Sequence, residues 1–246
     1  MRRLRAPDGC PWDREQTLAD ARGYLLEEAH EVAAAIDGGD PDEVAAELGD
    51  LFFQSVFVAT LLEERDEARL VDMLTTVHSK MVDRHPHVFG DVDATTADEV
   101  NRIWEARKAR DAEAGRSILD GVPASLPALL AAYRLTQKAA GVGFDWSEPE
   151  PVYAKVEEEL DEVRSATGAA DPTVAEEVGD LLFAVVNLSR HLGVDPEGAL
   201  AATNRKFRRR FAHVERELAA RGRRPDESDL EEMDRLWEDA KRRETR

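Results

Sequence analysis

Pairs of acidic residues with helical spacing occur in both halves of the chain. In the second half, Glu159 and Glu162 are three positions apart, as are Glu177 and Asp180. Residues three or four positions apart share a helix face, so each pair would project together. The first half has the same spacing in Glu28, Glu31, Glu47 and Asp50. Each half therefore offers two carboxylate pairs, one from each of two helices.

The second pair in each half opens an apolar run. Asp50 precedes residues 51–62, and Asp180 precedes residues 181–188. Helices that are apolar nearly all round belong to a core, so carboxylates at their start would lie beside that core. Four converging carboxylates repel one another and shift each other's pKa unless a cation neutralises them. The alternative is a solvated acidic face crossed by salt bridges.

The ligand types favour a hard divalent cation. Neither set contains a cysteine or a repeated histidine, and carboxylates alone suit Mg²⁺, with Mn²⁺ as a substitute. Magnesium keeps water ligands and takes phosphate oxygens in its remaining positions, which indicates phosphoryl chemistry. A carboxylate outside the ligand set could accept the proton of an attacking water, and Glu158 and Glu176 are the adjacent candidates.

Cations and an indole ring could hold the rest of a phosphate-bearing substrate. Lys206 and Arg210 are one helical turn apart in the densest basic run of the chain, and Trp237 and Lys241 have the same spacing. The alternatives are a solvated basic face for the first pair, and a core tryptophan with a snorkelling lysine for the second.

The chain is an internal duplication. Four motifs of the first half recur in the same order in the second. The matched ranges are 27–31 with 158–162, 47–53 with 177–183, 80–88 with 206–214, and 104–108 with 237–241. Between the copies, residues 114–124 are rich in Gly, Pro and Ser and interrupt the helical pattern. We therefore predict an N-terminal domain over 1–113, a linker over 114–124 and a C-terminal domain over 125–246.

Composition and periodicity predict an all-α protein made of two helical bundles. Of the 246 residues, 35% are charged and only 6% are aromatic, which favours helices over sheet. Asp40-Pro41 and Asp171-Pro172 each place a capping residue before a proline at the first helical position. The predicted helices span 17–37, 41–64, 67–84, 96–113, 128–140, 150–167, 172–191, 196–221 and 228–244.

Charge and cysteine content exclude several classes of function. A formal net charge of −19 repels nucleic acid and anionic lipid, so neither is expected as a partner. Cys10 is the single cysteine, which rules out an internal disulfide and fits a reducing compartment, with Cys10 as a packing residue. The start of the sequence lacks the apolar stretch of a signal peptide, and the run 51–62 is too short to cross a bilayer. The sequence predicts a cytoplasmic protein.

These motifs resemble those of a known enzyme superfamily. Glu-Glu-x-x-Glu followed by Glu-x-x-Asp is similar to the metal motif of the all-α nucleoside triphosphate (NTP) pyrophosphohydrolases. The tandem arrangement resembles the MazG-type members over nearly the whole chain. The supporting motifs are Gly9–Asp13, Arg84–Phe89, Gly143–Trp146 and Asn187–Leu192.

The resemblance implies an activity and a set of site residues. It implies hydrolysis between the α and β phosphates to a nucleoside monophosphate (NMP) and pyrophosphate, with Mg²⁺, broad base tolerance and a house-cleaning or nucleotide-pool role. It also implies a homodimer of tandem bundles. The implied metal ligands are Glu159, Glu162, Glu177 and Asp180. The implied nucleotide contacts are Lys155, Thr173, Val174, Ala175, Glu176, Lys206, Arg210, Trp237 and Lys241.

The two copies differ at positions that matter for catalysis. Lys155 lies one turn before Glu159, whereas Tyr24 takes the matching place before Glu28. Pro86 should end the helix that carries Lys80, while the matching helix continues through residues 211–212. We therefore predict the main catalytic site in the C-terminal copy. The N-terminal set Glu28, Glu31, Glu47 and Asp50 is a second candidate metal site.

Two other functions remain open from the residues alone. Glu27-x-x-His30 fits the ligand pattern of ferritin-like di-iron bundles, but Asp161 takes the place of His30 in the second copy. A non-enzymatic acidic scaffold would explain the charge, but not the recurrence of Trp, Lys and Arg in register. His85 and His87 suggest zinc only if a third ligand joins them.

Overall fold

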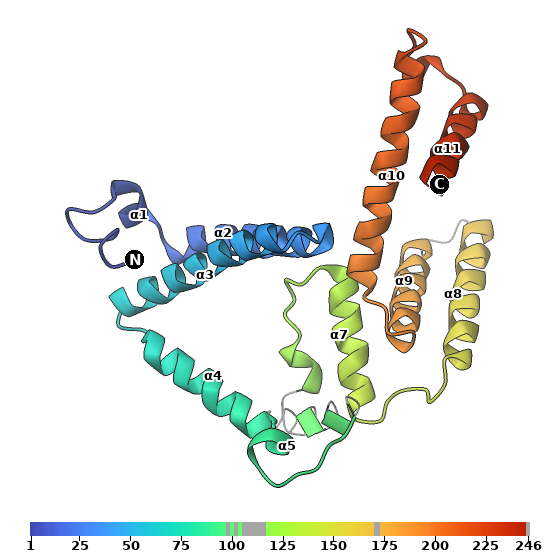
Figure 1. Ribbon diagram of the computed structural model, residues 1–246. Coiled ribbons are helices and arrows are strands. Elements are labelled where there is room, and N and C mark those ends of the chain that lie inside the picture. The colour runs from blue at the N-terminus through green and yellow to red at the C-terminus, as the bar shows by residue number, and fades with distance from the viewer. Residues whose placement is uncertain (97–98, 101–102, 105–116, 170–172, 245–246) are drawn as a thin grey trace. The chain divides into compact units, whose positions relative to one another are not determined.

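The computed structural model describes residues 1–96, 99–100, 103–104, 117–169 and 173–244 (Figure 1). The chain divides into two compact units, Met1–Thr96 and Ala97–Arg246. Every regular element in the described ranges is a helix, which confirms the predicted all-α class. The predicted domain limits at 113 and 125 stay a prediction, because residues 105–116 lie outside the described residues.

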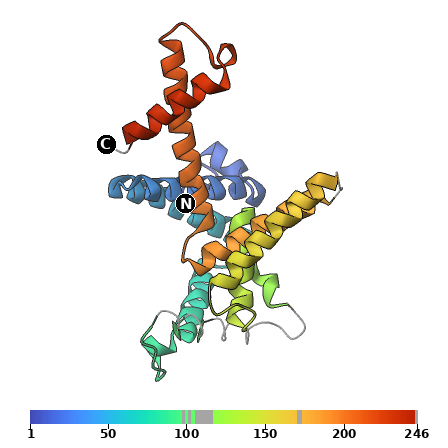
Figure 2. The same ribbon diagram turned by 90° about the vertical axis from the view of Figure 1, so that its right-hand side faces the viewer.

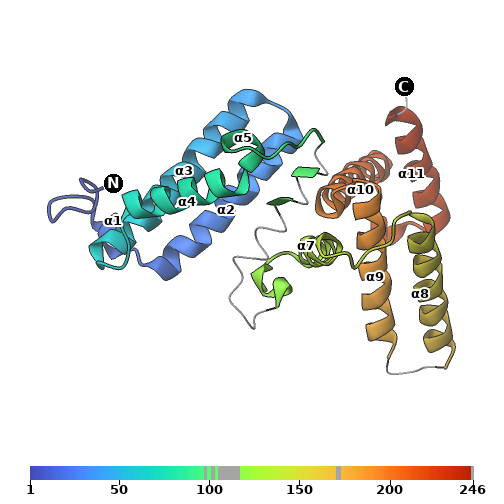
Figure 3. The ribbon, with the colours of Figure 1, turned by 90° about the horizontal axis from the view of Figure 1, so that it is seen from below.

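The first unit is centred on an antiparallel pair of long helices, α2 and α3, which lie side by side (Figure 3). Thr17 and Asp20 form a capping box at the start of α2, and Gly39 ends that helix with a left-handed φ of 80°. Asp40 then caps α3 by accepting a hydrogen bond from Asp42 N, as predicted. The elements are α1 (Pro11–Glu15), α2 (Leu18–Gly38), α3 (Pro41–Glu64), α4 (Leu70–Arg84) and α5 (Pro86–Phe89).

The core of the first unit lies at one end of this helix pair. Ala21, Phe57 and Leu61 are buried there, and Leu18 packs against them. The Arg5 guanidinium lies 5.5 Å from the Phe57 ring centroid and also pairs with a carboxylate of α3. The α2–α3 pair is thus fixed by packing at the end away from the acidic motif.

The break at Pro86 occurs as predicted. Helix α4 ends at Arg84, and a new short helix begins at Pro86. Proline has no N–H to continue the helical ladder, and its ring clashes with the preceding turn. In the second unit α10 runs unbroken from Pro196 to Ala219. The two copies therefore differ in shape at this point as well as in sequence.

The second unit contains a three-helix group and a helical hairpin. Helices α8 and α9 run antiparallel, and α7 packs against α9 (Figures 1 and 2). Helices α10 and α11 form the hairpin, with Val214, Leu218 and Leu236 as its buried core. The elements are η1 (Ile118–Gly121), α7 (Ala128–Gly141), α8 (Glu150–Ala169), α9 (Val174–His191), α10 (Pro196–Ala219), η2 (Pro225–Glu227) and α11 (Leu230–Glu244).

Predicted helix limits agree with the structure to within three residues at each end where both can be compared. The largest shift is at the start of α4, which begins at Leu70 instead of residue 67. The predicted helix over 96–113 falls mostly outside the described residues, and so does the predicted cap at Asp171. The short helices α1, α5, η1 and η2 were not predicted, because so few residues show no periodicity.

Helix α3 is long and apolar enough to span a membrane by length and composition alone. The apolar run 51–62 by itself is too short to cross a bilayer. The helix that contains it starts at Pro41, however, and is long enough as a whole. Core helices of soluble proteins pass the same test, so a single such helix is weak evidence. The absence of a membrane partner therefore stays a prediction.

Candidate metal centre and adjoining pocket

The carboxylates of the C-terminal copy converge between α8 and α9. Helix α8 carries Glu159, and α9 carries Glu177 and Asp180. One carboxylate oxygen from each of the three lies within 4.8 Å of the others. Glu159 is 5% exposed, whereas Asp180 lies at the surface. The two acidic pairs that the sequence singled out thus meet in space.

Glu162 faces the same cluster from the next turn of α8. Partial desolvation raises the pKa of Glu162 above its usual value, and the charges of Glu159 and Glu177 raise that pKa further. Like charges at short range disfavour ionisation in this way. All four predicted ligands therefore contribute negative charge to one place, although their role as metal ligands stays a prediction.

Glu159 shows that the cluster is electrostatically incomplete. Its Oε1 lies 2.6 Å from the Lys155 ammonium, but its buried Oε2 has no hydrogen-bond partner. A buried carboxylate oxygen without a partner costs free energy, and native proteins rarely leave one. A hard divalent cation among the three converging carboxylates would satisfy that oxygen. The residues fit such an ion.

Lys155 supplies the nearest positive charge. Its Nζ lies 2.6 Å from Glu159 Oε1 and 3.0 Å from Glu158 Oε1. Hydrogen bonds to Glu159 and then to Glu158 raise the pKa of Lys155 above its usual value. Glu158 is exposed and is held by its contact with Lys155. Glu176 is exposed in the first turn of α9. Their role as a general base stays a prediction.

A pocket of about 300 Å³ adjoins the carboxylates. Lys155, Glu159 and Asp180 line one end of it, and residues of α7, of α9 and of the segment before α8 line the rest. These further residues include Thr136, Phe144, Trp146, Phe183, Asn187 and Arg190. Sequence reasoning did not assign them to the site. The signal was present for Asn187, which lies seven residues after Asp180 and hence on the same face of α9.

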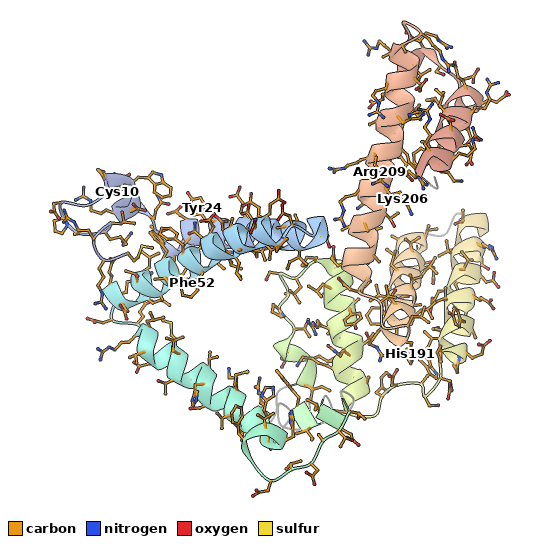
Figure 4. All side chains as sticks on the ribbon, in the orientation of Figure 1. Cys10, Tyr24, Phe52, His191, Lys206 and Arg209 are labelled. Carbon is orange, nitrogen blue, oxygen red and sulfur yellow. The ribbon has the colours of Figure 1, made fainter. Side chains whose placement is uncertain are left out.

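A polar network closes the far end of the pocket. The Arg190 guanidinium lies 2.5 Å from Asp145 Oδ1 and donates to Asn187 Oδ1 at 2.9 and 3.1 Å. His191 Nε2 lies 2.9 Å from the same Asp145 oxygen (Figure 4 labels His191). Desolvation alone would raise the pKa of Asp145, but Arg190 and His191 outweigh it and hold that pKa below its usual value. Asp145 is therefore a fixed anion that anchors Arg190.

The N-terminal copy has a similar but more open cluster. Carboxylate oxygens of Glu28, Glu47 and Asp50 lie within 4.8 Å of one another, and none of the three residues is buried. Desolvation raises the pKa of Glu28, with further contributions from Glu31 and Asp50. This second candidate metal site has carboxylates from the same helical positions as the first.

Two replacements distinguish the surroundings of the N-terminal cluster. Tyr24, in the place of Lys155, packs against Trp12 with ring centroids 5.8 Å apart (Figure 4 labels Tyr24). Phe57 lies in the place of Asn187 and is 3% exposed within the core. The first copy therefore has an aromatic core residue where the second has a polar pocket residue.

The remaining predicted nucleotide contacts lie elsewhere. Lys206, Arg210, Trp237 and Lys241 are on the α10–α11 hairpin, and none of them lines the described pocket (Figure 4 labels Lys206). The Arg210 guanidinium lies 5.7 Å from the Trp237 ring centroid and pairs with Glu244. Thr173, Val174, Ala175 and Glu176 lie at the start of α9. Their contact with nucleotide stays a prediction.

The histidine alternatives gain no support from the described residues. His30 is exposed. The two candidate metal-binding clusters among the described residues contain carboxylates only. The rings of His85 and His87 lie 5.6 Å apart, but no group of three ligands in the described ranges includes them. Cys10 is half-buried and precedes α1, in agreement with a packing role.

The raised pKa of Glu162 predicts a pH effect on stability. The folded state holds the Glu162 proton more tightly than the unfolded chain, so this group favours folding below the ordinary glutamate pKa of 4.5. That contribution is lost as pH rises through the higher folded pKa. In chelator, the urea midpoint of Glu162→Gln should therefore rise relative to the parent chain between pH 4.5 and neutrality. A constant difference between the two proteins across this range would contradict the assignment.

Comparisons with known proteins match this chain to one family model and to full-length relatives. A family model described as the MazG nucleotide pyrophosphohydrolase domain matches residues 16–89 and again residues 147–215. A nucleoside triphosphate pyrophosphohydrolase of Escherichia coli (strain K12) is 47% identical, over 99% of this chain and 95% of its own length. The nucleoside triphosphate pyrophosphohydrolase/pyrophosphatase MazG of Thermotoga maritima is 42% identical, over 98% of this chain and 92% of its own.

Proposed function

The chain belongs to the MazG nucleotide pyrophosphohydrolase family, and from this premise we propose that it hydrolyses NTPs to NMP and pyrophosphate with Mg²⁺. It is thus a hydrolase. The observation that carries the proposed site is the buried, unpartnered Oε2 of Glu159 among converging carboxylates. That oxygen needs a cation, and the adjoining pocket gives a nucleotide a place to lie.

The chemistry follows from the positions of the side chains. Glu159, Glu162, Glu177 and Asp180 would hold the divalent cation, which when bound would polarise the phosphate and lower the pKa of a water. Lys155 places its ammonium beside the same carboxylates and meets the phosphate charge. Glu158 or Glu176 accepts the proton of the attacking water. Water oxygen bonds to the α-phosphorus, the bond to the bridging oxygen breaks, and pyrophosphate leaves.

The C-terminal copy is the proposed main site. Its cluster has Lys155 and an open pocket, whereas the first copy has Tyr24 and Phe57 in the corresponding regions. Aromatic side chains cannot neutralise phosphate charge. The N-terminal carboxylates can still hold a cation, so the second site is proposed as a metal site of lower activity.

A homodimer is the proposed assembly. Val178, Leu182 and Val185 form an exposed apolar stripe at helical spacing on α9. Leu48 and Phe52 are exposed at the matching positions of α3 (Figure 4 labels Phe52). Apolar stripes of this kind mark interaction surfaces, and a self-complementary patch suits a two-fold dimer. A second copy would also bring another α10, with its basic run over residues 205–210, to the assembly.

The cellular setting is proposed on charge and composition. A net charge of −19 disfavours nucleic acid as a partner, and one cysteine suits the cytoplasm. Within that compartment the enzyme would remove damaged NTPs or lower an NTP pool.

Product analysis tests the activity. The protein is mixed with an NTP in chelator, in Mg²⁺ and in Mn²⁺, and the products are separated. We expect NMP and pyrophosphate in equal amounts, only when a divalent cation is present. Orthophosphate with nucleoside diphosphate would contradict the proposed bond cleavage. No turnover with iron-dependent colour would favour the di-iron alternative, and no turnover without metal binding would favour the scaffold.

A further inference from the structure

Asn187 is a buried amide at the end of the pocket away from the carboxylates. It is 8% exposed and lines the pocket. Its Oδ1 accepts two hydrogen bonds from Arg190, whereas its Nδ2 has no hydrogen-bond partner among the described residues. Nδ2 is not one of the fully buried atoms without a partner, so solvent reaches it, and a ligand or water in the pocket can accept from its two N–H groups.

The orientation of this amide is fixed by its neighbours. A guanidinium can only donate, so the oxygen of Asn187, and not the nitrogen, must face Arg190. Arg190 in turn is held by the carboxylate of Asp145, which also contacts His191. Turning the amide over would place N–H groups against N–H groups. The chain therefore presents a donor and excludes an acceptor at this place.

The position of Asn187 along α9 indicates which part of a bound nucleotide it would meet. It lies seven residues after Asp180, which at 1.5 Å per residue is about 10 Å along the helix axis. With the phosphates at the carboxylates, the sugar follows and the base extends toward Asn187. The edge of the base that reaches Asn187 is the one farthest from the sugar. In pyrimidines that edge carries the substituent at C4, and in purines it carries the substituent at C6.

We propose that Asn187, oriented by Arg190 and Asp145, selects nucleotides with a carbonyl oxygen at this edge over those with an amino group. Uracil, thymine, guanine and hypoxanthine offer the oxygen, whereas cytosine and adenine offer an amino donor that faces another donor. Asn187 is the specificity-determining residue, and Arg190 and Asp145 are positioning residues. The inference rests on the proposed function, because it takes the pocket ligand to be a nucleotide.

The N-terminal copy supports a special role for this position. Its counterpart of Asn187 is Phe57, and Thr60 takes the place of Arg190. Phe57 is buried in the core with Ala21 and Leu61. A buried asparagine is thus not required by this helical fold, since the same helix position is filled by a hydrocarbon ring in the other copy.

Binding of monophosphates to the full chain tests the inference without hydrolysis. The probes are two matched pairs, UMP with CMP and IMP with AMP, which have no phosphoanhydride bond to hydrolyse, and titration calorimetry in saturating Mg²⁺ gives their Kd values. We expect the carbonyl member of each pair to bind about tenfold more tightly, because an amino group would leave the amide donor unpaired. Equal Kd values within both pairs, or tighter binding of CMP and AMP, would overturn the proposal.

Variants then assign the preference to the network. Asn187→Leu removes the donor at similar volume and should bring both ratios close to one, while Ser189→Ala, on the same helix, should leave them unchanged. Arg190→Met frees the amide to turn, so binding of CMP and AMP should improve as the ratios fall. A purely structural role for Arg190 would weaken all four nucleotides equally. Ratios that persist in Asn187→Leu would overturn the assignment.

The rates of hydrolysis separate this inference from the proposed function. With Mg²⁺, kcat/KM should be about tenfold higher for UTP than for CTP, and for ITP than for ATP. Equal hydrolysis of all four would leave the pyrophosphohydrolase activity standing and overturn the base preference alone. If none of the four is hydrolysed and no monophosphate binds, the proposed function fails and the base preference fails with it.

Discussion

Replacing Glu159 with glutamine is expected to lower kcat/KM for NTPs by roughly 10³-fold, or about 4 kcal/mol of transition-state stabilisation. Glu159 is the buried member of the carboxylate cluster, and its unpartnered oxygen points to a role in holding the cation. Glutamine keeps the volume but removes the charge that attracts a divalent ion. The measurements are steady-state rates in saturating Mg²⁺ and calorimetric titration of Mn²⁺ into the free protein.

The matched control is Glu28→Gln, the same change at the same helical position of the first copy. It should leave kcat/KM within about threefold of the parent, because the first copy has Tyr24 in the place of Lys155 and Phe57 in the place of Asn187. Each variant should lose binding of Mn²⁺ at its own cluster only. Equal losses of activity from Glu159→Gln and Glu28→Gln would overturn the assignment of the main site, and so would equal losses from Glu162→Gln and Glu31→Gln.

Replacing Lys155 with methionine is expected to have opposite effects on substrate and on metal. The ammonium now pairs with Glu159 and Glu158. Its loss removes a charge-assisted contact to phosphate, which should lower kcat/KM by about 30- to 100-fold. Binding of Mn²⁺ alone should strengthen, because a competing cation has left the carboxylates. Rates at varied NTP and a titration of Mn²⁺ without nucleotide give the two quantities.

Arg164→Met is the control for charge on the same helix. Arg164 forms an exposed pair with Asp161, which is worth little because solvent screens it. Neither the rate nor the affinity for Mn²⁺ should change. If Lys155→Met weakens Mn²⁺ binding, the lysine is a support for the cluster and not a competitor, and its proposed contact with phosphate loses its basis.

The sequence predicted the helices and the acidic cluster because both depend on local spacing. Carboxylates three positions apart share a face wherever the chain is helical. The cap at the start of α3 can be recognised from two consecutive residues, Asp40 and Pro41. Duplication strengthened these predictions, since each motif was seen twice. Convergence of the α8 and α9 pairs followed from the two helices being consecutive.

The far end of the pocket could not be predicted in the same way. Asp145 and Arg190 are 45 positions apart, and no periodicity links a loop residue to a helix residue. Asn187 begins one of the motifs that support the family resemblance, but it was not assigned to the site, because a single amide in an apolar run has no evident role from the sequence. Its donor role depends on which side of the amide Arg190 occupies, and only coordinates show that.

The hairpin residues illustrate the opposite limit. Spacing predicted that Lys206 lies one turn from Arg210 and that Trp237 lies one turn from Lys241, but it did not predict that Arg210 lies over Trp237. Spacing fixes neighbours within one helix only. It does not fix the distance from that hairpin to a pocket formed by other helices, which depends on long-range packing and on any partner subunit.

Phe57 gives the two copies different needs. In the first copy the ring of Phe57 fills the interior at this helix position, whereas the second copy keeps a hollow of about 300 Å³ there that a ligand can occupy. Duplication has thus produced one copy that spends this position on packing and another that leaves it available for recognition.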